Sequence, residues 1–544
     1  MAIAHRIPEW DNSTLVAVVA TLSLPVLTYC YSTFRFHQAK RSRRSGREPP
    51  TVPYWLPWAC HALPLATGAS AFFAHAIKKH GDASPFLIRA GPMSFLIVRD
   101  AKNVKRVFQA STAITSVDIH AQIYERVMGM PTDLLPFYQP GNNESTDAAH
   151  YNLSRKHLSG EPLIKLSETY ITLLRKNLAQ DILKLGASPE IRDLWQLVQH
   201  HSTHAIIETL FGSTIFEIYP EVVADFWEID GYIDFFARNM PRIAAPSAYR
   251  TRDRMIHKLK IWLEHSEAGR KETHLVHEDW HPVAGSNFMR HRDHTLSAIP
   301  GFNVEGRASE ILALMVGAIS NTIPSTFWTI FEALRNPAIR ERLNIVFKDT
   351  VDVKKNHFDM QEISSNTFVQ SFGAEIGRVR MGSPLMRQCV VDGFQLGDYT
   401  IRKGTSVLMF SSDLGLNEEA WRDARPEMLA RPLTEFWAER FIVKKSEPSP
   451  GEGNSEEKVT KERFSTERVN ALCAQFGGGL RLCPGRHLAK IIQVSTLAVL
   501  FSEYHVEFIQ PSRAQAAIPP TRQAAFGAMK PSEPVNVRIQ KVEK

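Results

Sequence analysis

The longest hydrophobic stretch of this 544-residue chain lies near its start, where Leu15 to Tyr31 is almost entirely apolar. The stretch is just long enough to cross a bilayer, which requires about 20 apolar residues. Only Arg6 precedes it, whereas six Lys and Arg residues follow between positions 35 and 47. Because basic residues gather on the cytoplasmic side, we expect the bulk of the chain to face the cytosol. A cleaved signal peptide, the alternative, shows the reverse order of charge and apolar run.

Shorter patterns predict a small β region followed by a mostly helical body. Residues 86–99 read as two short strands about a Gly-Pro turn, and helical spacing begins at Val104. A strongly apolar helix begins near Ser309 and is interrupted between Gly317 and Pro324, where the proline is expected to kink it. A last helical run extends from Pro484 to Phe501. The pattern therefore predicts a mainly α fold with small β-sheets.

The same patterns divide the chain into an anchor, a connector and one large domain. Residues 1–34 are predicted to form a lumenal tip and a transmembrane helix, and residues 35–58 a basic, proline-rich connector. No internal repeat is visible, so residues 59–544 are expected to share one core. Within them, residues 443–469 are polar and rich in proline and glycine, which is typical of a flexible surface insertion.

Charge and cysteine content narrow the class of protein. The net charge of +7 is modest for this length, and several basic residues share one short segment, so nucleic-acid binding is not indicated. The five cysteines form no Cys-x-x-Cys pair and no even framework. Disulfides and a structural zinc site are therefore not expected, and the bulk of the chain is assigned to a reducing compartment.

One cysteine stands where chemistry is expected. The loop from Phe476 to Arg486 contains three consecutive glycines and brings Cys483 to the start of the last helical run. Unpaired backbone N–H groups and the helix dipole favour a thiolate at such a place. The glycines allow the backbone to approach a flat, bulky group, and Pro484 suits a first helical turn. A buried structural cysteine is the plain alternative.

This loop resembles the cysteine-ligand loop of the cytochrome P450 family, whose pattern is Phe-x-x-Gly-x-Arg-x-Cys-x-Gly. The five fixed positions are met by Phe476, Gly479, Arg481, Cys483 and Gly485. The resemblance implies haem b with its iron held by the Cys483 thiolate, with Arg481 pairing a propionate and Phe476 packing near the sulfur. It also implies that residues 59–544 form a haem-thiolate catalytic domain with the cytochrome P450 fold.

Two further segments resemble the family's supporting charges. Glu375 and Arg378 form a Glu-x-x-Arg pair, whose members share one helix face. Arg440 lies in a segment similar to the family's aromatic-x-Pro-Glu-Arg-Phe, with Ala438 in place of the proline. The resemblance implies a buried charge cluster behind the haem that fixes the cysteine loop. It also implies that Arg387 pairs a propionate.

Arg155 is a further candidate for a propionate. Together with Tyr151 it has the i, i+4 spacing at which the family places an aromatic residue and an arginine. The alternative is an exposed helical arginine.

The interrupted helix resembles the family's helix across the oxygen-binding face, with Ala318 and Thr322 matching its pattern. Ile319 replaces a glycine, and Asn321 replaces the acid that relays protons. Asn-Thr-Ile-Pro followed by Phe-Trp is instead similar to the subgroup of sterol 7α-hydroxylases, oxysterol hydroxylases and prostacyclin synthase. Thr322 and Asn321 are thus the candidate catalytic residues, with the Thr322 hydroxyl guiding protons. The alternative is a threonine bonded to a carbonyl one turn back.

A segment near the C-terminus, residues 524–529, resembles the hairpin tip that enters the substrate pocket in this family. An ordinary apolar turn is the alternative.

Taken together, the resemblance implies a monooxygenase that is single-pass in the endoplasmic reticulum membrane with its catalytic domain in the cytosol. Its electrons come from NADPH through a partner cytochrome reductase, and its substrate is hydrophobic: a sterol, a terpenoid or another secondary metabolite. Two alternatives remain open. One is a haem-thiolate isomerase or dehydratase acting on a lipid peroxide without O2, and the other is a non-catalytic haem-binding sensor.

Overall fold

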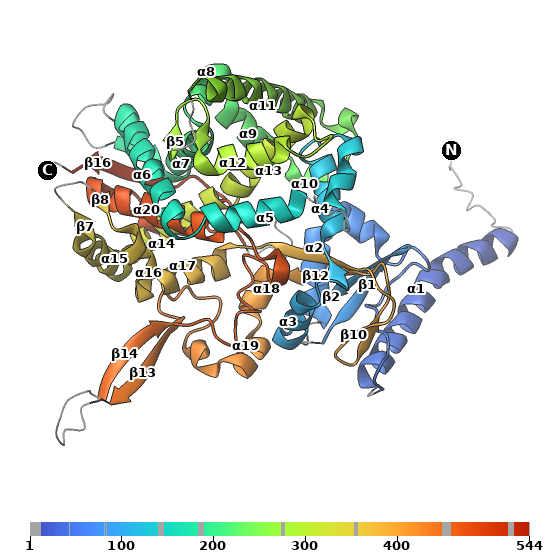
Figure 1. Ribbon diagram of the computed structural model, residues 1–544. Helices are drawn as coiled ribbons and strands as arrows, with labels where there is room; N and C mark the ends of the chain where they lie inside the picture. The colour runs from blue at the N-terminus through green and yellow to red at the C-terminus, as the bar shows by residue number, and fades with distance from the viewer. Residues whose placement is uncertain are drawn as a thin grey trace, which may run out of the picture.

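The computed structural model describes residues 12–542 except for 43, 81, 83, 140–145, 183–189, 274–277, 353–356, 449–457 and 521–526. Within these residues most of the chain is helical, and the strands form small sheets (Figure 1). The expectation of a mainly α fold with small β-sheets is confirmed. 

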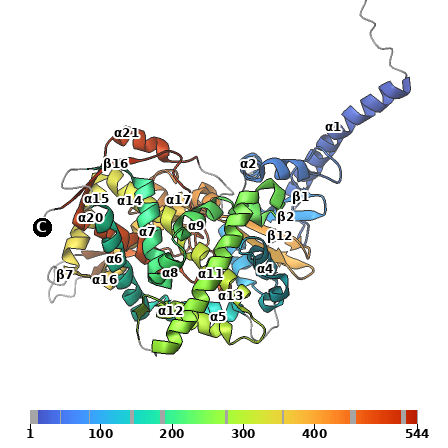
Figure 2. The same ribbon diagram turned by 90° about the horizontal axis from the view of Figure 1, so that it is seen from above.

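The body is built from long helices that cross one another (Figure 2). They are α6 (Gly160–Ile182), α7 (Leu194–Phe211), α11 (Pro246–Thr273), α13 (Val304–Ile319), α14 (Thr322–Arg335), α17 (Thr367–Arg380) and α20 (Arg486–Glu503). α14 lies at the centre of the core and packs on α7, α17 and α20. Every residue from Thr322 to Ala333 is buried. Most of these residues are apolar, and the polar ones are paired inside the core: the hydroxyls of Ser325, Thr326 and Thr329 donate to carbonyls within the helix, and Glu332 pairs with Arg380.

Shorter helices connect and cover these elements. They are α2 (Ala62–His80), α3 (Ala101–Gln109), α4 (Val117–Arg126), α5 (Thr146–His157), α8 (Thr214–Ile218), α9 (Val222–Gly231), α10 (Ile233–Ala237), α12 (Asn287–Ser297), α15 (Pro337–Asp349), α16 (Met360–Ser365), α18 (Ser411–Leu416), α19 (Glu418–Ala424) and α21 (Pro511–Ala514). Two short 3-10 helices matter for the site and its surroundings, η1 (Thr132–Tyr138) and η6 (Gly479–Arg481).

The largest sheet has five strands in the order β1-β2-β12-β9-β3. Its strands are β1 (Phe86–Ala90), β2 (Met93–Ile97), β12 (Ser406–Phe410), β9 (Pro384–Cys389) and β3 (Ile114–Thr115). The predicted pair of strands about a Gly-Pro turn is β1 and β2, which pair antiparallel with Phe86 opposite Ile97. Gly91 has φ +57° at this turn, a conformation that glycine adopts without strain. β9 carries Arg387 toward the site.

The remaining sheets are smaller. Three strands, β15 (Tyr504–Phe508), β16 (Asn536–Lys541) and β4 (Glu190–Asp193), form one of them. Three two-stranded pairs are β10 (Phe394–Leu396) with β11 (Tyr399–Ile401), β5 (Trp280–His281) with β6 (Gly285–Ser286), and β7 (Val351–Asp352) with β8 (His357–Phe358).

The first helix, α1 (Asn12–Arg41), projects from the body (Figures 1 and 2). It continues to Arg41, beyond the predicted end of the anchor at residue 34, because no helix breaker follows the apolar run. Among the described residues, the one segment that is long and apolar enough to cross a membrane is 304–335. That segment is 67% buried and is the core pair α13–α14. The transmembrane anchor therefore stays a prediction.

The segment expected to be an irregular insertion, 443–469, contains two strands. β13 (Ile442–Pro448) and β14 (Lys458–Phe464) pair antiparallel as a hairpin that projects from the body (Figure 1). Residues 449–457 lie outside the described residues. The hairpin base is continuous with the core, because Ile442 pairs with Phe464 and the ring of Phe464 lies 6.3 Å from that of buried Phe441. This pairing was not expected from the segment's polar composition.

Candidate active site

The cysteine loop turns sharply before helix α20. Gly477 and Gly479 have φ values of +74° and +68°, and η6 follows directly. The N–H group of Cys483 donates to the carbonyl oxygen of Phe476 over 2.9 Å, which closes the loop. α20 begins at Arg486, so Cys483 lies immediately before the positive end of an 18-residue helix.

Two glycines of the loop pack closely against Phe108, a contact that the sequence did not indicate. A Cβ atom at Gly479 would overlap the carbonyl oxygen of Phe108, at the end of α3, and a Cβ atom at Gly478 would overlap the ring of Phe108. The loop can therefore pack on α3 only because both positions lack side chains. Gly485 differs, since a Cβ atom there would meet no protein atom within 4 Å.

The thiol of Cys483 is affected by opposing influences. Burial raises the pKa of the Cys483 thiol, whereas hydrogen bonds from the backbone N–H groups of Gly485 and Arg486 and the charge of Arg486 lower it. Both N–H groups belong to the start of α20, and that of Arg486 also donates to the carbonyl oxygen of Cys483 over 3.4 Å. The site therefore provides donors for a thiolate, as a metal-bound sulfur requires.

Two arginines lie close to each other near this loop. Burial and the neighbouring positive charge of Arg481 lower the pKa of Arg387 to about 10. Arg387 is 9% exposed and donates to the carbonyl oxygen of Met386 over 3.1 Å. No carboxylate among the described residues forms an ion pair with Arg387. Two neighbouring positive charges favour an anionic ligand close to both.

Arg155 lies in the last turn of α5 and is exposed. No hydrogen bond from its guanidinium to a described residue is present, and Ser159 contacts only its backbone carbonyl. Its role as a propionate partner stays a prediction.

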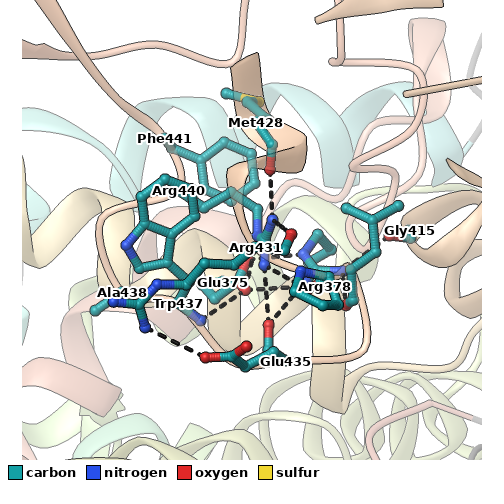
Figure 3. Close-up of polar contacts among 12 residues, drawn as sticks. Glu375, Arg378, Gly415, Met428, Arg431, Glu435, Trp437, Ala438, Arg440 and Phe441 are labelled. Carbon is teal, nitrogen blue, oxygen red and sulfur yellow. Dashed lines mark hydrogen bonds and ion pairs between the residues drawn. The ribbon is translucent and has the colours of Figure 1, made fainter. Parts of the chain in front are cut away.

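Glu375, Arg378 and Arg440 come together in a fully buried charge cluster (Figure 3). Arg378 binds Glu375 with two N–H groups, each over 2.7 Å, and Arg440 Nε donates to Glu375 Oε1 over 3.1 Å. The backbone N–H group of Trp437 donates to the same oxygen over 3.0 Å. Burial lowers the pKa of Arg440, while Glu375 raises it and Arg378 lowers it.

The two arginines of the cluster also donate hydrogen bonds to backbone carbonyls. All five N–H groups of the Arg440 guanidinium have acceptors, because Nη1 donates to the carbonyls of Met428 and Arg431, and Nη2 to those of Pro432 and Glu435. Arg378 likewise donates to the carbonyls of Gly415 and Leu433. These bonds fix the chain between Gly415 and Glu435 against the cluster.

Sequence reasoning missed how this cluster reaches the cysteine loop. A Cβ atom at Gly377, between the two cluster members on α17, would lie 2.7 Å from Gln475 Nε2. Cys473 is close to the cluster as well, and burial raises the pKa of its thiol to about 12. The glycine at 377 in the Glu-x-x-Arg stretch was the available signal, because it permits close approach of the loop at 473–476.

The interrupted helix is two helices in the structure. α13 ends at Ile319, and α14 begins at Thr322, with Asn321 as its N-cap. Pro324 has no N–H group to donate to the carbonyl of Ser320 four residues back, which explains the break. The Ser320 hydroxyl is buried and has no hydrogen-bond partner among the described residues.

Thr322 is 3% exposed. No described residue accepts a hydrogen bond from its hydroxyl, whereas its carbonyl accepts from the hydroxyls of Ser325 and Thr326 over 2.9 and 2.8 Å. The alternative of a hydroxyl bonded to a carbonyl one turn back therefore does not apply to Thr322; it applies to Thr326.

Asn321 contacts the C-terminal segment. Its Oδ1 accepts a hydrogen bond from the N–H group of Ala528 over 2.8 Å. Residues 524–526 of the expected hairpin tip lie outside the described residues, but 527–529 lie against the helix break. The sequence indicated neither this bond nor that the two segments meet.

The residues present fit a haem. Cys483 has N–H donors for a thiolate, Arg387 and Arg481 together suit propionates, and Gly485 leaves space beside the sulfur. The unpartnered Ser320 hydroxyl provides a polar group at the helix break. An electron-rich sulfur ligand and a paired cationic site are the donor set that a haem-thiolate centre requires.

Comparison with known proteins agrees with this geometry. The family described as Cytochrome P450 matches residues 49–537. Cytochrome P450 monooxygenase fsoE of Humicola fuscoatra is 26% identical over 97% of this chain and 95% of its own length. Cytochrome P450 monooxygenase efuG of Hormonema carpetanum is 24% identical over 91% of each, and cytochrome P450 7B1 of Mus musculus 22% over 87% of each. The chain therefore belongs to the cytochrome P450 family of monooxygenases.

Proposed function

We propose that this protein is a membrane-anchored haem-thiolate monooxygenase that oxidises a hydrophobic sterol, terpenoid or other secondary metabolite. The observation that carries the proposal is Cys483, presented at the start of α20 with two N–H donors and braced through the cluster around Glu375. When bound, haem b supplies the oxidising chemistry, using O2 and electrons from NADPH delivered by a partner reductase.

Around Cys483, the protein's own residues would hold and orient the haem. Cys483 would hold the haem iron, and the N–H groups of Gly485 and Arg486 would stabilise its negative charge. Arg387 and Arg481 would bind the propionates, since their positive charges lie close together. Phe476 fixes the loop through its carbonyl and carries Lys490 Nζ 5.7 Å above its ring.

At the helix break, Thr322 would handle protons. Thr322 is 3% exposed and its hydroxyl donates to no described residue, so the hydroxyl is available to donate to a ligand at the helix break. Ser320, also unpartnered, lies in the same turn. A hydroxyl placed there can hold a proton at Oγ1 and pass it on while apolar residues of α14 exclude bulk water.

α1 supports the proposed anchor in the endoplasmic reticulum. It presents large exposed apolar side chains, and its last turn ends in Lys40 and Arg41. Leu22, Leu24, Val26, Leu27, Tyr31 and Phe34 are all at least half exposed. Trp55 and Trp58 continue this apolar surface past the helix, with Trp58 87% exposed. Amphipathic rings near a basic helix end suit a membrane interface, and the catalytic domain would face the cytosol.

The names of relatives support the substrate class. The 5-beta-cholestane-3-alpha,7-alpha-diol 12-alpha-hydroxylase of Sus scrofa is 23% identical over 92% of this chain and 94% of its own length. A polycyclic lipid entering from the bilayer would match both this relative and the exposed apolar helix. Screening sterols and terpenoids for a substrate-induced low-to-high spin shift would identify the class.

An isomerase or dehydratase acting on a lipid peroxide is the second candidate. The observation that favours it is Asn321, which stands in the position of an acid and has its oxygen bound to Ala528. Activity that persists without O2 and without reductase would select this candidate. Activity that requires both would select the monooxygenase.

The central test asks whether Cys483 is the ligand of the haem iron. Cys483→Ala should abolish the thiolate absorption band of the reduced, carbon monoxide-treated protein, because it removes the sulfur that is proposed to bind the iron. Cys473→Ala is the matched control, since Cys473 is partly buried, stands ten positions earlier (483 − 473) beside the charge cluster and has no proposed iron contact. A thiolate band that survives in Cys483→Ala, or one lost equally in the control, would overturn the proposal. Haem binding without O2 or peroxide consumption with any lipid would point to the sensor instead.

A further inference from the structure

The segment Gly527 to Met529 is fastened to the helix break from several sides. Ala528 donates its N–H group to Asn321 Oδ1 over 2.8 Å, and Met529 donates to the carbonyl of Arg380 over 3.1 Å. Trp328 Nε1 donates to the carbonyl of Met529 over 2.5 Å. Ala528 and Met529 are 8% and 7% exposed. Asn321 is the one side chain among these partners that belongs to the break itself.

Asn321 does not use its side chain in the way that its position suggests. An asparagine at the N-cap normally accepts a hydrogen bond from the N–H group of the second or third helical residue. Asn321 is the N-cap of α14, yet its side chain makes no such bond. The third helical residue is Pro324, which has no N–H group to offer. The oxygen is directed to Ala528 instead.

Gly527 is matched to the same contact. Its φ of +86° favours glycine, and a Cβ atom there would overlap Asn321 Oδ1. Gly527 also accepts a hydrogen bond from the N–H group of Gly382 over 3.1 Å. The close approach of the C-terminal segment to Asn321 thus depends on a small residue on one side and a side-chain acceptor on the other.

We propose that Asn321 is a positioning residue that fixes segment 527–529 beside Thr322, and that it thereby sets the shape of the substrate side of the pocket. A carboxamide has no proton to release near neutral pH, so Asn321 does not replace the family's acid chemically. It acts through its oxygen, which holds the Ala528 backbone in place. The inference rests on the proposed function only in assigning this segment to the substrate side.

Backbone amide exchange of the haem-loaded, full-length protein tests the contact directly. Asn321→Ala should speed exchange of the Ala528 N–H group by about five-fold or more, because one net hydrogen bond is lost. Asn321→Asp keeps an acceptor of the same shape and should retain the protection. The Met529 N–H group, bonded to Arg380, is the internal reference resolved by overlapping peptides. Unchanged Ala528 exchange in Asn321→Ala would overturn the proposal.

Ligand size tests the effect on pocket shape. Imidazole is a small ligand, whereas 1-(triphenylmethyl)imidazole is bulky, and we expect only the bulky azole to extend to the segment. Asn321→Ala should change the dissociation constant of the bulky azole by about five-fold and that of imidazole by less than about two-fold. Asn321→Asp should restore the bulky-azole value, a rescue that general damage to the fold would not allow. Equal changes for both azoles, or no change for either, would overturn the inference.

If Asn321→Ala does not fold, Gly527→Ala provides a second test of the same contact. It should displace the segment with Asn321 intact and produce the same difference between the two azoles. Neither measurement involves turnover. A failure of the monooxygenase proposal therefore leaves these results standing, and a failure of these results leaves the oxygen and reductase tests unaffected.

Discussion

Replacing Arg440 by lysine should lower the free energy needed to open the cysteine loop, although the charge of the cluster stays the same. The Arg440 guanidinium uses all five of its N–H groups, one for Glu375 and four for backbone carbonyls. A lysine ammonium has three donors and no planar fork. At least two acceptors in a site that is 1% exposed therefore lose their partner.

The free-energy cost of Arg440→Lys follows from those two acceptors. A buried acceptor left without a donor costs about 1 to 3 kcal/mol. The carbonyl of Pro432 keeps a bond from the N–H group of Glu435, and the carbonyl of Glu435 keeps one from Arg378. These remaining bonds place the total near the low end, at about 2 kcal/mol, which is about a 30-fold rise in the opened population.

The assay is the decay of the thiolate absorption band of the reduced, carbon monoxide-bound protein at a fixed elevated temperature. Arg440→Lys should shorten its half-time by up to about 30-fold. Arg431→Lys is the matched control, because Arg431 is 53% exposed and its ion pair with Glu435 is on the surface. Such pairs contribute about 0 to 1 kcal/mol. Equal half-times for Arg440→Lys and the wild type would refute the reasoning.

Three further predictions concern the loop, the haem and pH. Gly479→Ala should lower the yield of folded protein, because its Cβ atom would overlap the carbonyl of Phe108, whereas Gly485→Ala has space and should leave the thermal midpoint unchanged. Arg387→Gln should speed haem loss to apomyoglobin by about ten-fold, since a charge-assisted bond of about 1.5 kcal/mol or more is removed. Burial and the charges of neighbouring His and Lys side chains lower the pKa of His157 to about 4. The unfolded chain thus binds a proton that the folded chain does not, so stability should fall as pH drops from 6.5 toward 4, by up to about 3 kcal/mol. His157→Phe should flatten that dependence in thermal unfolding scans.

Each of these can fail in a defined way. Equal folded yields for the two glycine variants would show that α3 moves to accommodate a methyl group. Haem loss from Arg387→Gln at the wild-type rate would remove Arg387 from the propionate site. A pH slope that is identical in His157→Phe would assign the dependence to other groups, such as His80, whose pKa burial and nearby charges also lower to about 4.

The cysteine loop illustrates how far local sequence reaches. Glycines, a proline and a following helical period predict a tight turn that carries Cys483 to a helix start, and the structure has that turn. The partner of the glycines could not be predicted in this way. Phe108 is 370 positions away (478 − 108) and meets the loop only after the chain has folded.

The insertion and the first helix show where local sequence was a poor guide to the structure. Composition described 443–469 as irregular, yet β13 and β14 pair because each strand supplies the other's backbone hydrogen bonds. The apolar run predicted a helix, and α1 continues past it through a basic stretch that composition had assigned to the connector. Local propensity is a weak guide wherever pairing or helix continuation decides the outcome.

By itself, the sequence determined the mainly helical class, the turn that presents Cys483 at a helix start and the residue types that surround it, since these depend on spacing along the chain. Only the tertiary structure decided which groups meet. Glu375 and Arg440 are 65 positions apart, and Asn321 and Ala528 are 207. Their contacts depend on how helices cross and how carbonyls far along the chain are satisfied. A hydrogen bond forms between atoms about 3 Å apart, and the order of residues does not specify that separation.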